Sequence, residues 1–134
     1  MADRDEEIIA RIRHFYDAFN RGDFDAAAAL AHPDIDFFRS GGLPPVKGAE
    51  ALREWMEPDA FDAQAFEPVE VVVNGDKVLI RQTARVRGAE SRIEMELESW
   101  TVCTLDDDRR LVVRIEVFQR DQEDEARRAA GLTD

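Results

Sequence analysis

Apolar side chains near the start of the chain recur with the spacing of one helix face, which predicts an amphipathic helix from about residue 4 to residue 20. The residues of that face are Ile8, Ile12, Phe15, Tyr16 and Phe19. Gly22 suits the left-handed backbone that often follows a helix, and Asp23 can cap the next one. The next helix is rich in alanine, and we expect Pro33 to end it because proline disfavours helix in the residue before it.

The middle of the chain changes from helical spacing to the two-residue period of strands. Residues 35–38 are expected to form a short strand and residues 49–57 a third helix, which Pro58 ends. Asn74-Gly75 is a strong hairpin signal. We expect the remaining strands over residues 67–73, 77–87, 92–105 and 110–119, and a short helix over residues 121–130. Helices followed by long antiparallel strands predict an α+β domain with its helices on one face of the sheet.

Composition adds limits to this picture. The 134 residues fit a single domain over residues 1–134, and 44% of them are hydrophobic, which is typical of a folded chain. The net charge is 18 − 30 = −12, which argues against nucleic acid and anionic membranes as partners. No apolar run could span a membrane and the acidic start has no leader pattern, so we expect a cytoplasmic protein. The single cysteine, Cys103, lies in an apolar strand, where an inert buried thiol is expected.

Two rows of side chains alternate along the strand predicted at residues 92–105. The apolar row is Ile93, Met95 and Leu97, and the opposite row is Glu94, Glu96 and Glu98. Beyond residue 98 the acidic row continues as Trp100 and Val102. Either a β-bulge shifts the register there, or both faces are buried, one under helices and the other against a second subunit. We favour the second explanation, a homodimer through the outer face of the sheet, because exposed Trp100 and Val102 would form a sticky patch.

The last strand carries a charged pair in an apolar context. Its two rows are Val113, Ile115 and Val117 and, on the other side, Arg114, Glu116 and Phe118. If the second row faces the interior, the guanidinium keeps the carboxylate ionised in a low-dielectric space, where it can act as a base or bind a hydroxyl. The alternative is a structural ion pair with the neighbouring strand or with a dimer partner.

Several segments match one known family in order and spacing. They are Phe15-Tyr16-Asp17-Ala18-Phe19-Asn20-Arg21-Gly22-Asp23-Phe24-Asp25, residues 35–38, Val46 to Leu52, Asn74 to Val78 and Arg114 to Phe118. Together they resemble the nuclear transport factor 2-like superfamily, with the SnoaL-like group as the most similar branch. The resemblance implies a cone-shaped α+β barrel, in which three helices pack on a strongly curved, mainly antiparallel sheet. It does not imply one activity, because this fold hosts isomerases, cyclases, dehydratases, hydrolases and binding proteins.

By this resemblance the cone holds a pocket for a small ligand. Its lining would be Phe15, Phe19, Phe37, Trp55, Met56, Ile80, Gln82, Leu97, Ser99, Thr101, Arg114, Glu116 and Phe118. The positions that match the polar residues of ketosteroid isomerases of this fold are Phe15, Arg39 and Thr101, so steroid isomerase chemistry is not expected. His14 and His32 are expected at the surface and at a helix end, and not as the paired histidines of scytalone dehydratase-like enzymes.

Two functions are open. In the first, the protein binds a small, partly apolar metabolite and performs cofactor-independent acid–base chemistry of the isomerase, cyclase or hydrolase type. Glu116 would be the base, Arg114 or Arg39 would stabilise negative charge, and Tyr16 would be an acid if it turns inward. The residues expected to orient the ligand by hydrogen bonds are Gln82, Ser99 and Thr101. In the second, the fold is a non-catalytic ligand-binding or dimeric accessory module. Neither uses a metal, since two distant histidines and one buried cysteine make no metal site.

Overall fold

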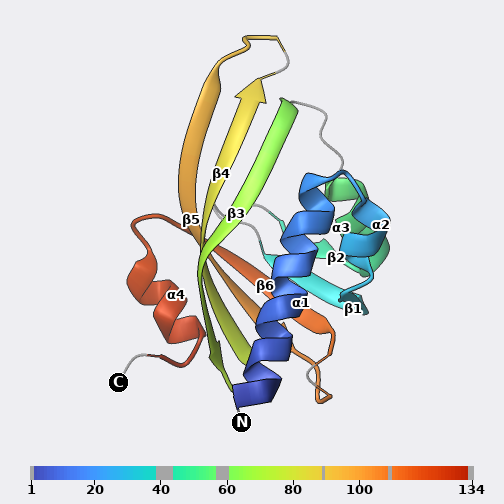
Figure 1. Cartoon of the computed structure of the whole chain (residues 1–134), viewed down its shortest axis with the longest axis vertical. Helices are drawn as coiled ribbons and strands as arrows, with labels where there is room; N and C mark the ends of the chain where they lie inside the picture. Colours follow the sequence, from blue (N-terminus) through green and yellow to red (C-terminus); the bar gives the residue numbers. More distant parts are fainter. Residues whose placement is uncertain (1, 39–43, 57–60, 89, 109, 133–134) are drawn as a thin grey trace.

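The computed structural model describes residues 2–38, 44–56, 61–88, 90–108 and 110–132 of the 134-residue chain. Helices and strands follow one another in this described part as Figure 1 shows. In chain order they are α1 (Ala2–Asn20), α2 (Phe24–Ala28), β1 (Ala31–Phe38), β2 (Val46–Lys47), α3 (Ala49–Met56), β3 (Phe61–Asn74), β4 (Lys77–Gly88), β5 (Glu94–Leu105), β6 (Val112–Gln119) and α4 (Glu123–Ala129). The expected order of helices, long strands and a short final helix is confirmed, but β2 has no counterpart among the expected elements and β3 begins six residues before the expected strand.

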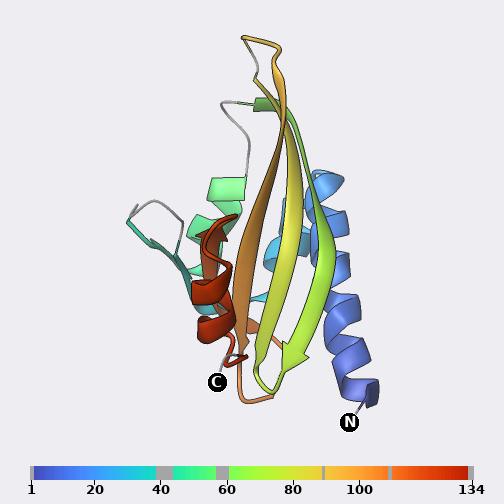
Figure 2. The ribbon, with the colours of Figure 1, turned by 90° about the vertical axis from the view of Figure 1, so that its left-hand side faces the viewer.

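The strands form one curved sheet with the order β2-β1-β6-β5-β4-β3. Neighbouring strands are antiparallel, except that β1 and β6 run parallel. α1 and α4 lie on opposite faces of the sheet (Figures 1 and 2), and we call these the inner and the outer face. The expected α+β cone, with three helices packed on a strongly curved, mainly antiparallel sheet, is therefore confirmed. α4 departs from the expectation, because it covers the other face.

The turn between the first two helices forms as its sequence predicts. Gly22 has a positive φ of 79° and donates its N–H to the Phe19 carbonyl at 3.0 Å. The next N–H, of Asp23, reaches back to the Ala18 carbonyl at 2.9 Å, which completes a Schellman-type helix end. Asp23 Oδ1 accepts from the N–H of Ala26 at 3.2 Å and so caps α2.

The predicted end of the second helix at Pro33 is wrong. α2 ends at Ala28, and Pro33 lies inside β1. β1 pairs with β6 at Ala31 and again from Asp36 onward, with an irregular register in between. Because proline cannot donate a hydrogen bond to a ladder, it is tolerated in this irregular part of the strand.

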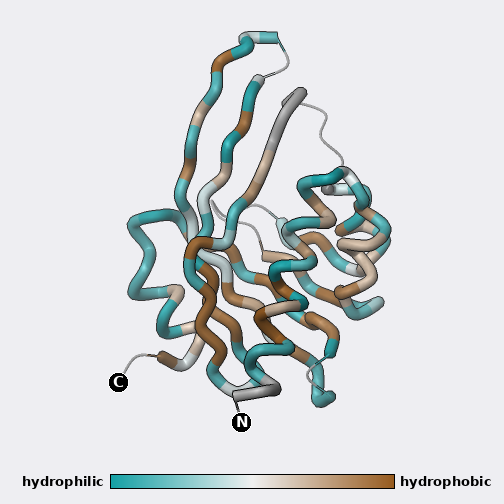
Figure 3. The backbone as a smooth tube through the Cα atoms, in the orientation of Figure 1, coloured by the Kyte–Doolittle hydropathy of each residue, from teal (hydrophilic) through white to brown (hydrophobic). Residues whose placement is uncertain are grey.

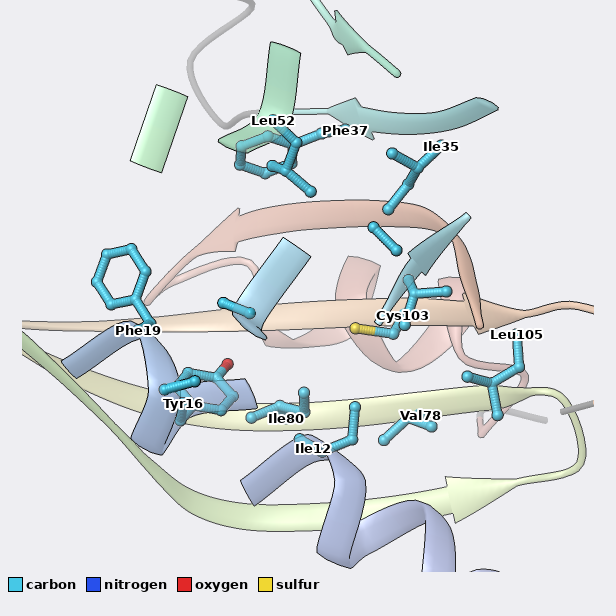
Figure 4. Packing of buried hydrophobic residues seen from close by; sticks show 14 of the residues in the cluster. Ile12, Tyr16, Phe19, Ile35, Phe37, Leu52, Val78, Ile80, Cys103 and Leu105 are labelled. Atoms are coloured by element: carbon cyan, nitrogen blue, oxygen red, sulfur yellow. The ribbon is translucent and has the colours of Figure 1, made fainter. Parts of the chain in front are cut away.

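The larger apolar core lies between α1 and the inner face. Ile12 and Tyr16 of α1 point toward Val78 and Ile80 of β4 (Figure 4). Figure 3 shows the same concentration of apolar residues where the strands run beside α1. Burying one such aliphatic side chain contributes roughly 1.5–3 kcal/mol, so this packing holds α1 on the sheet and sets the inner wall of the cone.

A second apolar core lies on the outer face and contains the two residues that were expected against a second subunit. Trp100 is 4% exposed and Val102 is fully buried, and both pack against Ala126 and Ala130 at the α4 side. The Trp100 indole N–H donates to the Arg120 carbonyl at 3.3 Å. Both faces of β5 are buried here without a bulge in the β4–β5 register. The cover over Trp100 and Val102 is therefore the chain's own helix, and a homodimer through the outer face of the sheet stays a prediction.

The β4–β5 hairpin extends beyond the helices (Figures 1 and 2). On the β5 side of this hairpin the inward row is solvent-exposed: Ile93 is 61%, Met95 47% and Leu97 52% exposed, whereas Ala84 and Val86 on the β4 side are buried. β6 pairs with β5 only as far as Ser99, so the edge of β5 before this residue has no neighbouring strand among the described residues. The outer row of this edge is Glu94, Glu96 and Glu98, whose carboxylates at 96 and 98 lie 3.9 Å from Arg85 and Arg81, respectively.

Candidate functional site

A cavity of about 130 Å³ lies between α1, β1, α3 and the inner face of the sheet. The residues of its wall are Ile8, Arg11, Ile12, Phe15, Tyr16, Phe19, Leu30, Ala31, Ile35, Phe37, Leu52, Trp55, Phe66, Ile80, Gln82, Thr101, Cys103, Leu105, Arg110, Val112, Ile115 and Val117. This wall is predominantly apolar. An engineered protein cavity of about 150 Å³ holds a benzene ring, so the space matches one ring or a short branched chain.

Many of the residues expected in the pocket come together in this wall. They are Phe15, Tyr16, Phe19, Phe37, Trp55, Ile80, Gln82 and Thr101. Tyr16 does turn inward, and the Phe37 and Trp55 rings meet edge to face with centroids 4.7 Å apart. Their part in ligand binding stays a prediction, and the structure adds that they share one space.

Other expected residues do not reach the wall. They are Leu97, Ser99, Arg114, Glu116 and Phe118. Leu97 lies on the exposed part of β5. Ser99 lies behind Gln82 and accepts a hydrogen bond from Gln82 Nε2 at 3.0 Å. Arg114, Glu116 and Phe118 share one row of β6, and the orientation of this strand explains why none of them reaches the wall.

The expected orientation of β6 is reversed in the structure. Ile115 pairs with Cys103 and Val117 with Thr101 across the β5–β6 ladder, and residues that pair directly lie on the same face. Because Thr101 and Cys103 line the cavity, Ile115 and Val117 of the apolar row line it as well. The alternate row therefore faces outward, where Phe118 packs in the core under α4.

Arg114 and Glu116 form an ion pair on this outer face. Arg114 Nε lies 3.2 Å from Glu116 Oε1, and the guanidinium also stacks over the Phe38 ring at 4.4 Å. The Arg114 side chain is 47% exposed, so solvent screens the pair. The geometric condition for Glu116 as a base in the cavity, an inward-facing row, is not met.

Two further residues that were expected in the pocket have no described side chain. Arg39 is outside the described residues, and of Met56 only the backbone in α3 is described. The predicted roles of both stay predictions.

A hydrogen-bonded chain of side chains closes one end of the cavity. The Tyr16 hydroxyl donates to Gln82 Oε1, and Gln82 Nε2 donates to Ser99 Oγ at 3.0 Å. Thr101 also hydrogen-bonds to the Tyr16 hydroxyl. Gln82 and Thr101 are 7% and 6% exposed, so the cost of burying them is offset by these partners. An amide with two N–H groups leaves one donor beyond the bond to Ser99.

Burial shifts the pKa of both acidic groups in this wall. It raises the pKa of the Tyr16 phenol far above its usual value of 10.0, with a smaller increase from Cys103 and an opposing effect of the Thr101 hydrogen bond. Burial also raises the pKa of the Cys103 thiol from 9.0 to about 12. Both groups are therefore neutral at pH 7. Among the described wall residues the remaining ionisable side chains are the arginines Arg11 and Arg110, so this part of the wall holds no ionised base.

Sequence comparison now identifies the family. The model of the SnoaL-like domain matches residues 12–114, which is more than half of the 134 residues. The chain belongs to the SnoaL-like family. The matched range runs from the middle of α1 into β6 and so contains most of the cavity wall. A search of curated protein sequences finds no match.

Solved structures resemble this SnoaL-like chain over nearly their whole length. TerC, co-crystallised with polyporic acid, is 19% identical and aligns over 88% of this chain and 95% of its own with a TM-score of 0.74. SalBIII, an epoxide hydrolase/cyclase-like enzyme in pyran ring formation of the polyether salinomycin, is 18% identical (86% and 92% covered, TM-score 0.76). An LEH-like epoxide hydrolase from M. tuberculosis is 15% identical (95% and 93% covered, TM-score 0.72). At these identities the similarity establishes the nuclear transport factor 2-like fold.

Sequence reasoning missed several wall residues of this SnoaL-like chain. They include Arg11, Cys103, Arg110, Ile115 and Val117. Arg11 borders the apolar stripe of α1, since Ile8, Ile12 and Phe15 flank it at helical spacing, and this signal was present in the sequence. For β6 no local signal exists, because either row of a strand can face the core until its neighbours are known.

The remaining candidates for chemistry lie away from the cavity. His14 is exposed, and His32 Nδ1 accepts from the Asp34 N–H at 3.0 Å. In the described part of the SnoaL-like chain, no group of three or more His, Cys, Asp and Glu side chains is placed to hold a metal ion. Of the helices described, none is long and apolar enough to cross a membrane.

Proposed function

We propose that this SnoaL-like protein binds a small, largely apolar molecule in the inner cavity and orients it with the polar end formed by Tyr16, Gln82 and Thr101. The observation that carries the proposal is a ring-sized apolar cavity that ends on buried, hydrogen-bonded side chains. Ligand pockets typically combine an apolar wall with a few converging polar groups. A ketone, ether or hydroxyl oxygen at this end would accept the second N–H of Gln82.

Catalysis of the cofactor-independent acid–base type is the second candidate. Tyr16 supports it, because the phenol stays protonated at working pH and lies in the cavity wall. Proteins of similar structure include an epoxide hydrolase and an epoxide hydrolase/cyclase-like enzyme, which supports an oxygen-containing substrate and a reaction of the isomerase, cyclase or hydrolase type. In such a reaction the Tyr16 hydroxyl would turn from Gln82 to a substrate oxygen and protonate it as the C–O bond of that oxygen breaks, and the attacking hydroxyl or water would return a proton to the tyrosinate.

The binding proposal is tested by filling the cavity. Val117 of β6 lines the wall, whereas Val113 of the same strand is also half-buried but does not. Neutral single-ring compounds such as toluene, phenol and acetophenone are titrated in a thermal-shift assay and by calorimetry. A compound at 100 times its Kd adds about 2.7 kcal/mol of stability. Val117→Phe should remove this gain and Val113→Phe should keep it.

The result that would overturn the proposal is equally concrete. Binding that survives Val117→Phe would place the ligand elsewhere, and no stabilisation by any compound of the panel would remove the support for an apolar site. If a compound is bound and also turned over, Tyr16→Phe should abolish turnover while Kd changes less than tenfold. Equal turnover in that variant would exclude Tyr16 as the acid.

A further inference from the structure

The charge of the cavity wall is opposite to that of the chain. The chain has 30 acidic and 18 basic residues. Among the described wall residues, however, no aspartate, glutamate, histidine or lysine occurs, and the two charged side chains are Arg11 and Arg110. Both charged side chains of the described wall are therefore basic, although most of this chain's charges are acidic.

Both arginines lie toward the end of the cavity away from the tyrosine network. Arg11 precedes Tyr16 by five residues on α1, which is about 7.5 Å along the helix axis. Arg110 lies two residues before Val112, which pairs with Leu105. Leu105 is four residues beyond Thr101 on β5, or about 13 Å. Figure 4 shows Tyr16 and Leu105 at opposite sides of the packed interior.

The turn before β6 fixes the position of Arg110. Asp106 Oδ1 accepts the backbone N–H of Arg110 at 2.9 Å and that of Leu111 at 3.3 Å. The nearby carboxylate is thus engaged by the main chain, while Asp107 and Asp108 are exposed. Because Arg110 both lines the cavity and is exposed, the cavity meets solvent at this end.

We propose that the ligand of this cavity carries a carboxylate, which Arg110 binds with the help of the positive charge of Arg11, while its apolar body fills the interior. A guanidinium at the mouth of an apolar cavity matches the geometry of a carboxylate and keeps the ion in contact with water, so the full cost of burying a charge is avoided. Arg11 already has an interaction within the protein, so Arg110 is the main partner of the carboxylate. The ligand class is therefore a small amphiphilic acid, such as an aryl- or branched alkyl-carboxylate.

This inference rests on the proposed function, and its test separates the two. 3-Phenylpropionate, 3-phenylpropanol and 3-phenylpropylamine share one apolar body and differ in charge. Their Kd values are measured by calorimetry for the wild type, Arg110→Gln, Arg11→Gln and Val117→Phe. Arg120→Gln is the matched control, because it removes an exposed arginine that is not in the wall.

The carboxylate should bind at least tenfold more tightly than the alcohol, and the amine should bind most weakly. Arg110→Gln should remove that preference without weakening the alcohol, and Arg120→Gln should leave it unchanged. A carboxylate that binds no better than the alcohol, with both lost in Val117→Phe, would overturn this inference and leave the apolar site standing. A preference that survives both Arg110→Gln and Arg11→Gln would also overturn it. Absence of binding by all three compounds would overturn both proposals.

Discussion

The Tyr16–Gln82 hydrogen bond gives the sharpest test of how the site is built. Tyr16→Phe removes one hydroxyl and little volume. Gln82 Oε1 then loses its donor inside the protein, since Gln82 is 7% exposed. A buried acceptor left without a partner costs about 1–3 kcal/mol. Unfolding entropy of about 2.1 cal/mol/K per residue over 134 residues gives roughly 0.28 kcal/mol/K, so Tm should fall by about 4–11 °C.

A double-mutant cycle assigns this loss to the hydrogen bond. Tyr16→Phe/Gln82→Met removes donor and acceptor together and keeps the volume nearly constant, so the double variant should lose less than the sum of its single variants, by about 1 kcal/mol or more. Ser99→Ala is the control and should cost less than Tyr16→Phe, because the hydrogen bond from Gln82 Nε2 to Ser99 Oγ is only partly buried. Urea unfolding followed by tryptophan fluorescence gives each free energy of unfolding. Additive losses, or a Tyr16→Phe variant within 0.5 kcal/mol of the wild type, would refute the reasoning.

Further predictions concern the thiol, the outer core and the hairpin edge. Because the pKa of Cys103 is raised, the folded protein keeps a proton that the unfolded chain loses above pH 9.0. The free energy of unfolding is therefore full below pH 9 and falls by about 1.4 kcal/mol per pH unit toward pH 12. In urea unfolding at pH 8–10, the free energy of unfolding of Cys103→Val should depend less on pH than that of the wild type, and an equal dependence would contradict the shift. Trp100→Ala should lower the free energy of unfolding by about 3–5 kcal/mol, and a loss under 1 kcal/mol in urea unfolding would mean that α4 does not depend on it. Combined Glu94→Gln, Glu96→Gln and Glu98→Gln should increase light scattering at millimolar protein concentration, because unpaired strand edges without charge associate, and unchanged scattering would show that the edge is protected in another way.

Local signals predicted the elements better than they predicted the site. The end of α1 at Gly22 and the hairpin at Asn74-Gly75 depend on residues close in sequence, and both form as expected. The part of the cavity wall that α1 supplies also follows from helical spacing, because that spacing depends on residues close in sequence. Pro33 was misjudged because an irregular strand register, which the sequence does not display, accommodates it.

What failed depends on contacts between distant segments. Whether Glu116 or Ile115 faces the interior is decided by pairing with Val102 and Cys103 on β5. Whether Trp100 meets a second chain or α4 is decided by where the last helix docks. Neither orientation can be predicted from the alternation of side chains in a single strand, because either face of an isolated strand can be the buried one.

The helix over the outer face has a consequence for synthesis on the ribosome. Leu79, Trp100 and Val102 are translated before residues 123–129, so the sheet can form while its outer face has no cover. Asn74 donates to the carbonyls of Ala130 and Gly131 at 2.9 and 3.2 Å. These two hydrogen bonds can form only after the last helix has docked on the sheet. The apolar strip of Leu79, Trp100 and Val102 is therefore exposed in any folding intermediate in which this helix has not yet docked.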